Sequence, residues 1–231
     1  MTRAVARVVR DDEDGLAAAI AALRAGGVVA IPTDTVYGIA VDLDTAQGIE
    51  RLFAVKDRAP EKAIAVLVDG LDQVAGLVDL SPAARVLANT GWPGGLTLVL
   101  ALDAAADLPV ALTAGTATLG VRVPDHPVPR QLARRLGPLP TTSANRSGEP
   151  DSLDAAAVLA TIGASVDLIV DGGPVPGQLA STVIDCVGSR PKVLRVGAIP
   201  PALLAEALAA AGLVHDLLAD RRDEGSATGG Q

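Results

Sequence analysis

The stretch LIVDGGPVPGQLASTVIDCVGSRPKVLRV, residues 168–196, decides the fold class of this chain. It contains three short runs rich in β-branched residues, Leu168–Asp171, Thr182–Val187 and Val193–Val196, which are separated by Gly, Pro and Ser. Runs of this kind bounded by turn residues predict β-strands. Because no long helical pattern lies between them, these strands follow one another quickly, and this predicts a sheet that is mixed rather than purely parallel.

Upstream of this stretch, predicted strands alternate with helical patterns. The strands are Val28–Ile31, Ile64–Val68, Leu96–Leu102 and Leu119–Val123. The helices are one capped by Asp44, one that starts at Ser81-Pro82, then Val128–Leu136, Leu153–Ile162 and a last one opened by Pro200-Pro201. This alternation predicts an α/β fold whose mixed sheet is flanked by helices.

The domain organisation is expected to be simple. The chain has 231 residues, of which 49% are hydrophobic, and this is enough to form one sizeable core. No linker divides residues 1–218, which we interpret as one domain. Residues 219–231 are polar and Gly-rich, so we expect a disordered C-terminal tail.

Composition excludes several classes of protein. Acidic residues outnumber basic ones by 27 to 19, and the net charge of -8 disfavours nucleic-acid binding over the whole surface. One Trp, one Tyr and one Phe cannot build an aromatic platform for single-stranded nucleic acid. A single cysteine, Cys186, excludes an internal disulfide. The two histidines, His126 and His215, are far apart in the sequence, so we expect no metal site of the zinc type.

The sequence also predicts where the protein resides. Its start, MTRAVARVVRDDEDG, lacks the apolar run of about 7 to 15 residues that a signal peptide needs. The most apolar stretch, Pro200–Val214, carries Glu206 and is shorter than the roughly 20 residues that span a bilayer. We therefore expect a cytoplasmic protein without membrane partners.

Small polar loops interrupt this apolar chain at several places, and functional groups often lie on such loops. Three of them have ordinary structural explanations. PTDTVYG, residues 32–38, fits a strand exit with turn residues, and KDRAPEK, residues 56–62, fits cations at a helix C-terminus. GWPGGLTLVL, residues 91–100, fits a packing corner around the single Trp.

Two further regions favour a ligand site as much as a structural role. Arg122 lies inside an apolar strand and needs a partner there, and TTSANRSG, residues 141–148, offers hydroxyl and amide groups to an anion. Ser181-Thr182 is a weaker candidate of the same type. Five cations stand near loops or strand ends that one sheet edge can bring together: Lys56, Arg58, Lys62, Arg122 and Arg195. Neither GxxxxGK[ST] nor GxGxxG occurs, so we predict an anion, most simply a nucleotide, in a cleft that is neither a P-loop nor a Rossmann crevice.

Seven motifs in fixed order resemble one known family. They are GGVVAIPTDTVYGIAVD, KDR, WPGGLTLVL, GVRVPDHP, TTSANRSGEP, STVID and LRVGAI, spread over residues 26–199. This set is similar to that of the YrdC-like family, the threonylcarbamoyl-AMP synthases. The resemblance implies a twisted, open α/β sheet with a basic concave face.

The resemblance also implies a reaction. Family members join L-threonine, bicarbonate and ATP into threonylcarbamoyl-AMP and release pyrophosphate, so this chain is expected to be a nucleotidyltransferase. A separate threonylcarbamoyl transferase would then modify adenosine 37 of tRNA, so the resemblance implies an indirect link to tRNA and leaves direct contact with RNA open. Mg²⁺ is expected to enter with ATP, held mostly by phosphate and water.

The same resemblance implies roles for individual residues. Lys56 and Arg58 would be catalytic, because fixed cations stabilise the charge that builds up on a transferring phosphoryl group. Threonine contacts are implied for Thr35, Arg122, Thr141 and Ser181. ATP contacts are implied for Arg58, Lys62, Thr118, Ser143, Asn145, Asp151 and Arg195.

Some positions depart from the family pattern. Asp34 replaces a Glu in PTETVYG, a change that we expect to be benign, and Leu67 stands where many members have a His that touches threonine. No general base for the threonine amine is evident. Two alternatives therefore remain: an RNA-binding relative without catalysis, and a paralogue that uses another amino acid or carbamoyl donor. The signatures Lys56-Asp57-Arg58 and Ser143-Ala144-Asn145 favour the enzyme.

Overall fold

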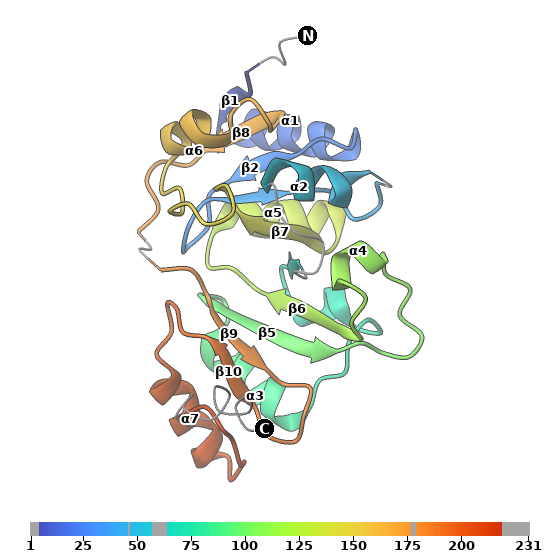
Figure 1. Ribbon diagram of the computed structural model, residues 1–231, viewed down its shortest axis with the longest axis vertical. Helices are drawn as coiled ribbons and strands as arrows, with labels where there is room; N and C mark the ends of the chain where they lie inside the picture. The colour runs from blue at the N-terminus through green and yellow to red at the C-terminus, as the bar shows by residue number, and fades with distance from the viewer. Residues whose placement is uncertain (1–4, 46, 57–63, 177–178, 219–231) are drawn as a thin grey trace, which may run out of the picture.

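The computed structural model describes residues 5–45, 47–56, 64–176 and 179–218, and its strands form one large sheet. Along the long axis of Figure 1 the strands follow the order β1-β8-β2-β3-β7-β4-β6-β5-β9-β10. Their bounds are β1 (Arg7–Arg10), β2 (Val29–Ile31), β3 (Gly38–Ala40), β4 (Ala65–Leu67), β5 (Leu96–Ala101), β6 (Thr118–Arg122), β7 (Leu139–Ser143), β8 (Leu168–Asp171), β9 (Thr182–Asp185) and β10 (Lys192–Arg195).

The sheet is mixed and open. β8 runs parallel to both β1 and β2, and the pairs β4–β6 and β5–β9 are also parallel. The five other pairs are antiparallel. Among the described strands β1 and β10 each have one neighbour, so the sheet does not close, and Figure 1 shows the strand direction turning along its length. The predicted α/β class with a twisted, open mixed sheet is confirmed.

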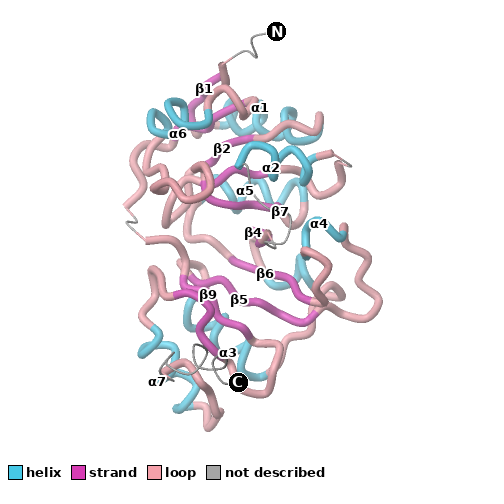
Figure 2. The backbone as a smooth tube through the Cα atoms, viewed as in Figure 1, coloured by secondary structure: helices cyan, strands magenta, loops and turns pink. Residues whose placement is uncertain are grey.

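Helices flank both faces of this sheet, as Figure 2 shows. Neighbouring residues of β2, Val29 and Ala30, belong to two different apolar clusters, and successive residues of a strand point to opposite faces. α1 (Glu13–Arg24) and α5 (Pro127–Leu136) pack in the cluster that contains Val29. α2 (Gly48–Lys56), α3 (Pro82–Gly91), α4 (Val110–Thr113), α6 (Ala155–Ile162) and α7 (Pro201–Ala210) pack in the larger cluster that contains Ala30. No helix of the described residues is long and apolar enough to cross a membrane.

All seven predicted strands are present, and the sheet contains three more. β1, β3 and β7 were not among the predicted strands, and each has a local reason. β1 has arginines at both ends, and β3 has only three residues directly after the PTDTVYG loop. β7 has the sequence LPTTS, in which Pro140 lacks the N–H group that a central strand normally donates.

The predicted helices are also present, with one capping residue corrected. The Ser81 Oγ accepts a hydrogen bond from the Ala84 N–H at 3.1 Å, so the predicted cap of α3 is confirmed. The prediction that Asp44 caps a helix is wrong, because α2 begins only at Gly48. Asp44 instead lies in a turn, where its N–H donates to the Asp42 side chain at 3.1 Å. Helix α1, capped by Asp12, was not predicted.

The alternation of side chains along the central strands creates the site. Leu119 and Val121 of β6 and Leu98 of β5 belong to the larger apolar cluster. The residues between them, such as Gly120 and Thr97, line a cavity on the opposite face. One face of these strands therefore stabilises the core while the other presents polar groups to a ligand.

Candidate active site

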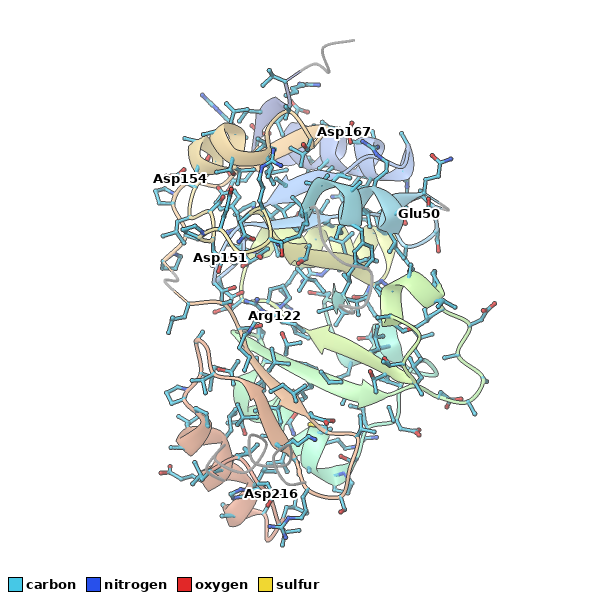
Figure 3. All side chains as sticks on the ribbon, viewed as in Figure 1. Glu50, Arg122, Asp151, Asp154, Asp167 and Asp216 are labelled. Carbon is cyan, nitrogen blue, oxygen red and sulfur yellow. The ribbon has the colours of Figure 1, made fainter. Side chains whose placement is uncertain are left out.

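A cavity of about 520 Å³ lies over the middle of the sheet. Ten of the predicted site residues line it: Thr35, Lys56, Thr118, Arg122, Thr141, Ser143, Asn145, Asp151, Ser181 and Arg195. Figure 3 labels Arg122 and Asp151, which lie near the middle of the long axis, between the upper and lower strands. The other two predicted residues, Arg58 and Lys62, lie outside the described residues. The roles of these residues remain predictions, but the fold does bring the ten described ones together.

Arg122 is held in place by three partners from two loops. Its Nη2 donates to the Asp34 carboxylate at 2.6 Å, and its Nη1 donates to the Thr35 hydroxyl at 2.9 Å. Its Nε donates to the Gly94 carbonyl at 3.0 Å. A guanidinium has five N–H donors, so two remain without an acceptor among the described residues. The fold therefore fixes the plane of this group before any ligand binds.

The surroundings of Arg122 are unusual for a cation. Its side chain is only 8% exposed and that of Asp34 only 14%. Burial lowers the pKa of Arg122, and the Asp34 carboxylate acts in the opposite direction. Arg195 is close enough to lower the pKa of Arg122 further by repulsion between the two cations. An anion placed between these two arginines would relieve that repulsion.

The loop that carries Asp34 and Thr35 is stiffened from within. The Thr33 hydroxyl donates to the Val36 carbonyl at 2.7 Å and accepts from the Thr35 N–H at 3.1 Å. Tyr37 follows directly, fully buried, and its hydroxyl donates to the Gly173 carbonyl at 2.8 Å. Burial raises the pKa of Tyr37 to about 12, so this phenol stays protonated at neutral pH. PTDTVYG is thus a strand exit and part of the site at once.

A second polar cluster joins the two signature motifs. The Lys56 Nζ donates to the Ser143 carbonyl at 2.7 Å, to the Ser143 Oγ at 3.0 Å and to the Asn145 Oδ1 at 2.8 Å. The Asn145 amide in turn donates to the Glu149 carbonyl. Lys56 is buried at the end of α2, so its ammonium both fixes the loop after β7 and places a positive charge at the cavity.

A third cluster lies at the start of β9. The hydroxyls of Thr97 and Ser181 are 2.8 Å apart. Arg195 donates to the Ser181 hydroxyl through Nη2 and to the Ser181 carbonyl through Nε, both at 3.1 Å. Burial lowers the pKa of Arg195, while the Asp151 carboxylate facing it acts to raise it. Thr97, Ser181 and Arg195 therefore form one connected polar row.

The two remaining predicted residues contribute hydroxyls from β7 and β6, the strands on either side of β4. The Thr141 Oγ1 donates to the Leu139 carbonyl at 2.8 Å, and Thr141 lines the cavity. The Thr118 Oγ1 shares a hydrogen bond of 2.8 Å with Thr116. Leu67 also lines the cavity, 4% exposed, and packs in the cluster of α1 and α5. The packing of Leu67 explains how an apolar side chain is accommodated at this position.

Sequence reasoning missed three residues of the site. Asp34 was noticed only as a benign change, whereas its carboxylate is the ion-pair partner of Arg122. Gly94 was assigned to a packing corner, yet its carbonyl accepts from the same arginine. Thr97 was read as part of a buried strand. The signal that the sequence offers is a threonine inside an otherwise apolar strand. The structure places this threonine on the cavity side, where it is buried.

The charge of the cavity is only partly defined by the described residues. Lys56, Arg122 and Arg195 line it together with one acid, Asp151. A basic concave face remains a prediction, because two of the expected cations lie outside the described residues.

Comparison with known proteins places the chain among relatives. A sequence model of the Sua5/YciO/YrdC family, described as "Telomere recombination", matches residues 21–197. The chain belongs to this family. A Mycobacterium tuberculosis protein provisionally named a threonylcarbamoyl-AMP synthase is 37% identical to this chain over 195 residues. The aligned region covers 84% of this chain and 89% of that protein. The Bacillus subtilis threonylcarbamoyl-AMP synthase is 36% identical over 186 residues, 80% of this chain and 54% of that protein.

Solved structures of the family show the same fold. Pyrococcus abyssi Sua5 complexed with L-threonine superposes with a TM-score of 0.81 at 30% identity, over 91% of this chain and 62% of that chain. Escherichia coli YciO superposes with a TM-score of 0.75, and at 24% identity it supports the fold alone. This family member thus spans little more than half of the B. subtilis relative and about three fifths of the P. abyssi chain.

Proposed function

We propose that this chain is a threonylcarbamoyl-AMP synthase, which joins L-threonine, bicarbonate and ATP and releases pyrophosphate. The observation that carries the proposal is the convergence of ten predicted site residues on one cavity that holds both an anchored guanidinium and a buried ammonium. Relatives named for this activity and the L-threonine complex of P. abyssi Sua5 support the same reaction.

The threonine end of the cavity is proposed to lie at Arg122. Its two remaining N–H groups suit a carboxylate, which a guanidinium binds through two parallel hydrogen bonds. Thr35 keeps this guanidinium in place and lines the cavity beside it. The hydroxyls of Thr141 and Ser181 line the same cavity and are proposed to meet the polar groups of the amino acid.

The nucleotide end is proposed to lie at Lys56 and the loop after β7. A carbamate oxygen attacks the α-phosphorus, the bond to the leaving pyrophosphate breaks, and negative charge builds up on both groups. The Lys56 ammonium, fixed by Ser143 and Asn145, stabilises this charge without having to reorganise. Arg58, Lys62, Thr118, Asp151 and Arg195 complete the proposed ATP contacts.

Mg²⁺ is proposed to enter as part of the ATP substrate, held mostly by phosphate oxygens and water. Among the described residues no group of three or more His, Cys, Asp or Glu side chains could hold a metal ion, and Asp151 is the acid that lines the cavity. The product is proposed to pass to a separate threonylcarbamoyl transferase that acts on tRNA, in the cytoplasm where tRNA and ATP are found.

Pyrophosphate release tests the proposal. It is expected only when ATP, L-threonine and bicarbonate are all present, and equal release without threonine would contradict it. Arg122→Lys keeps the charge but loses the two-pronged geometry, so the KM for threonine should rise at least about tenfold. Arg190→Lys, which alters an exposed ion pair with Asp216, is the matched control and should leave the KM unchanged.

A further inference from the structure

A row of cavity-lining residues crosses four neighbouring strands of the sheet. Leu98 pairs with Val121, so the next position on each antiparallel strand brings Thr97 beside Arg122. On its other side Thr97 pairs with Val183, and Val183 pairs with Arg195. The row therefore has a guanidinium at each end, from β6 and β10, with Thr97 and Val183 between them, and Ser181 adds a second hydroxyl two positions before Val183.

The hydroxyls in this row have one hydrogen to spare. The Ser181 Oγ accepts from Arg195, and one of the two hydroxyls, of Thr97 or Ser181, donates to the other. A pair of hydroxyls has two hydrogens, so one hydrogen finds no acceptor among the described residues. Thr97 is 6% exposed and Ser181 5%, and a buried donor without a partner is costly. This spare hydrogen is available to a ligand in the cavity.

The chemistry of the proposed reaction requires an anion at such a place. The neutral amine of threonine and bicarbonate form a C–N bond and release water, and the product, N-carboxythreonine, has two carboxylates three bonds apart. That separation is smaller than the spacing of neighbouring strands, about 4.8 Å. A ligand whose first carboxylate lies on Arg122 therefore has its second carboxylate within reach of a strand next to β6, where β4 offers the apolar Leu67 and β5 offers the Thr97 hydroxyl.

We propose that the Thr97–Ser181 hydroxyl pair binds the carboxyl group that comes from bicarbonate, with Arg195 holding the pair in position. This inference rests on the proposed function and extends it to a subsite for the third substrate. Thr97 is then a substrate-binding residue. The pair donates its spare hydrogen to the carbamate oxygen that does not attack phosphorus, and the two flanking cations favour the dianion.

Thr97→Val tests the inference, because valine keeps the shape and removes the hydroxyl. Pyrophosphate release measured at varied bicarbonate should show a KM for bicarbonate raised at least about tenfold, the usual effect of losing one hydrogen bond to a charged group. Threonine affinity, measured by calorimetry without bicarbonate, should change less than twofold. Thr97→Ser, which retains the hydroxyl, should stay close to the unmodified protein. Thr113→Val, a buried threonine outside the cavity, is the control for folding.

Two results would overturn the inference: an unchanged KM for bicarbonate in Thr97→Val, or an equal loss of affinity for threonine. A second measurement does not require turnover. With threonine present, the carbon-13 resonance of labelled bicarbonate should broaden with the unmodified protein and much less with Thr97→Val. If the unmodified protein releases no pyrophosphate from all three substrates, the proposed function fails. The carbon-13 measurement still judges the subsite, which is rejected if both proteins broaden the resonance equally.

Discussion

Asp34→Asn is expected to destabilise the protein strongly, because it leaves the buried Arg122 without its counter-charge. The two side chains are 14% and 8% exposed and their charged atoms are 2.6 Å apart. Removing one partner of a buried ion pair typically costs about 3–5 kcal/mol. Asparagine retains an oxygen that can accept from the guanidinium, so we place the loss near the lower limit, at about 3 kcal/mol.

Thermal unfolding measures this loss directly. For a chain of this size, 1 kcal/mol lowers the Tm by about 2–4 °C, so a decrease of about 6–12 °C is expected. Threonine affinity should fall as well, since a neutral amide then orients Arg122 less firmly than the carboxylate does, beside the Thr35 hydroxyl and the Gly94 carbonyl.

Asp216→Asn is the matched control. It removes the carboxylate of an exposed ion pair with Arg190, and exposed pairs contribute little to stability. If Asp34→Asn lowers the Tm no more than Asp216→Asn, the Asp34–Arg122 pair is not the anchor that its geometry indicates. Asp34→Glu, which keeps the negative charge on a longer side chain, should retain most of the thermal stability and of the threonine affinity.

Four further predictions follow from other contacts. Lys56→Met should lower turnover by at least about a hundredfold, the scale expected when a fixed charge-stabilising donor is lost, in a protein still folded by circular dichroism. Leu67→His should lower the Tm, because the side chain is 4% exposed in an apolar cluster, and a lower KM for threonine would show that the ring reaches the ligand. The free energy of unfolding of the unmodified protein should fall by about 2 kcal/mol between pH 10 and 12, and Tyr37→Phe should remove this fall. The raised pKa of this phenol stabilises the fold below pH 10, and that contribution disappears as pH rises through about 12. Deletion of everything after Leu218 should leave Tm and activity nearly unchanged, since that segment has almost no apolar residues to bury.

Strands were predictable where their side chains are apolar and unpredictable where the site begins. Leu96–Ala101 and Leu168–Asp171 are rich in leucine and β-branched residues, so the pattern of apolar residues and the composition both predict a strand. β7 is a central strand with the polar sequence LPTTS. Its polar residues are accommodated because their side chains face the cavity or the Lys56 ammonium. A strand that contributes to a binding site loses the apolar pattern by which strands are recognised.

The partners of the site residues were less predictable than their identities. Arg122 was expected to need a partner, but its partner Asp34 is 88 positions away in the sequence. Spacing alone cannot show which acid a buried arginine meets, since that depends on strand order. In the sheet, β7 and β4 lie between β3 and β6, an order that differs from the order along the chain. The contact between the β2–β3 loop and β6 therefore could not be predicted from sequence spacing.

Two long-range contacts tie the assembly of the site to the folding of the sheet. Lys56 joins α2 to the end of β7, and Arg122 joins β6 to the β2–β3 loop. Each contact links residues more than 80 positions apart, so both ends of the cavity depend on contacts between distant parts of the chain. Both links also use the cations proposed to bind substrate. A ligand that binds these cations therefore stabilises the same contacts that join distant parts of the sheet, and ATP and threonine should each raise the Tm by an amount that grows with the logarithm of the ligand concentration relative to its Kd. If the Tm did not respond to either ligand in a catalytically active protein, the coupling of the site to the fold would be refuted.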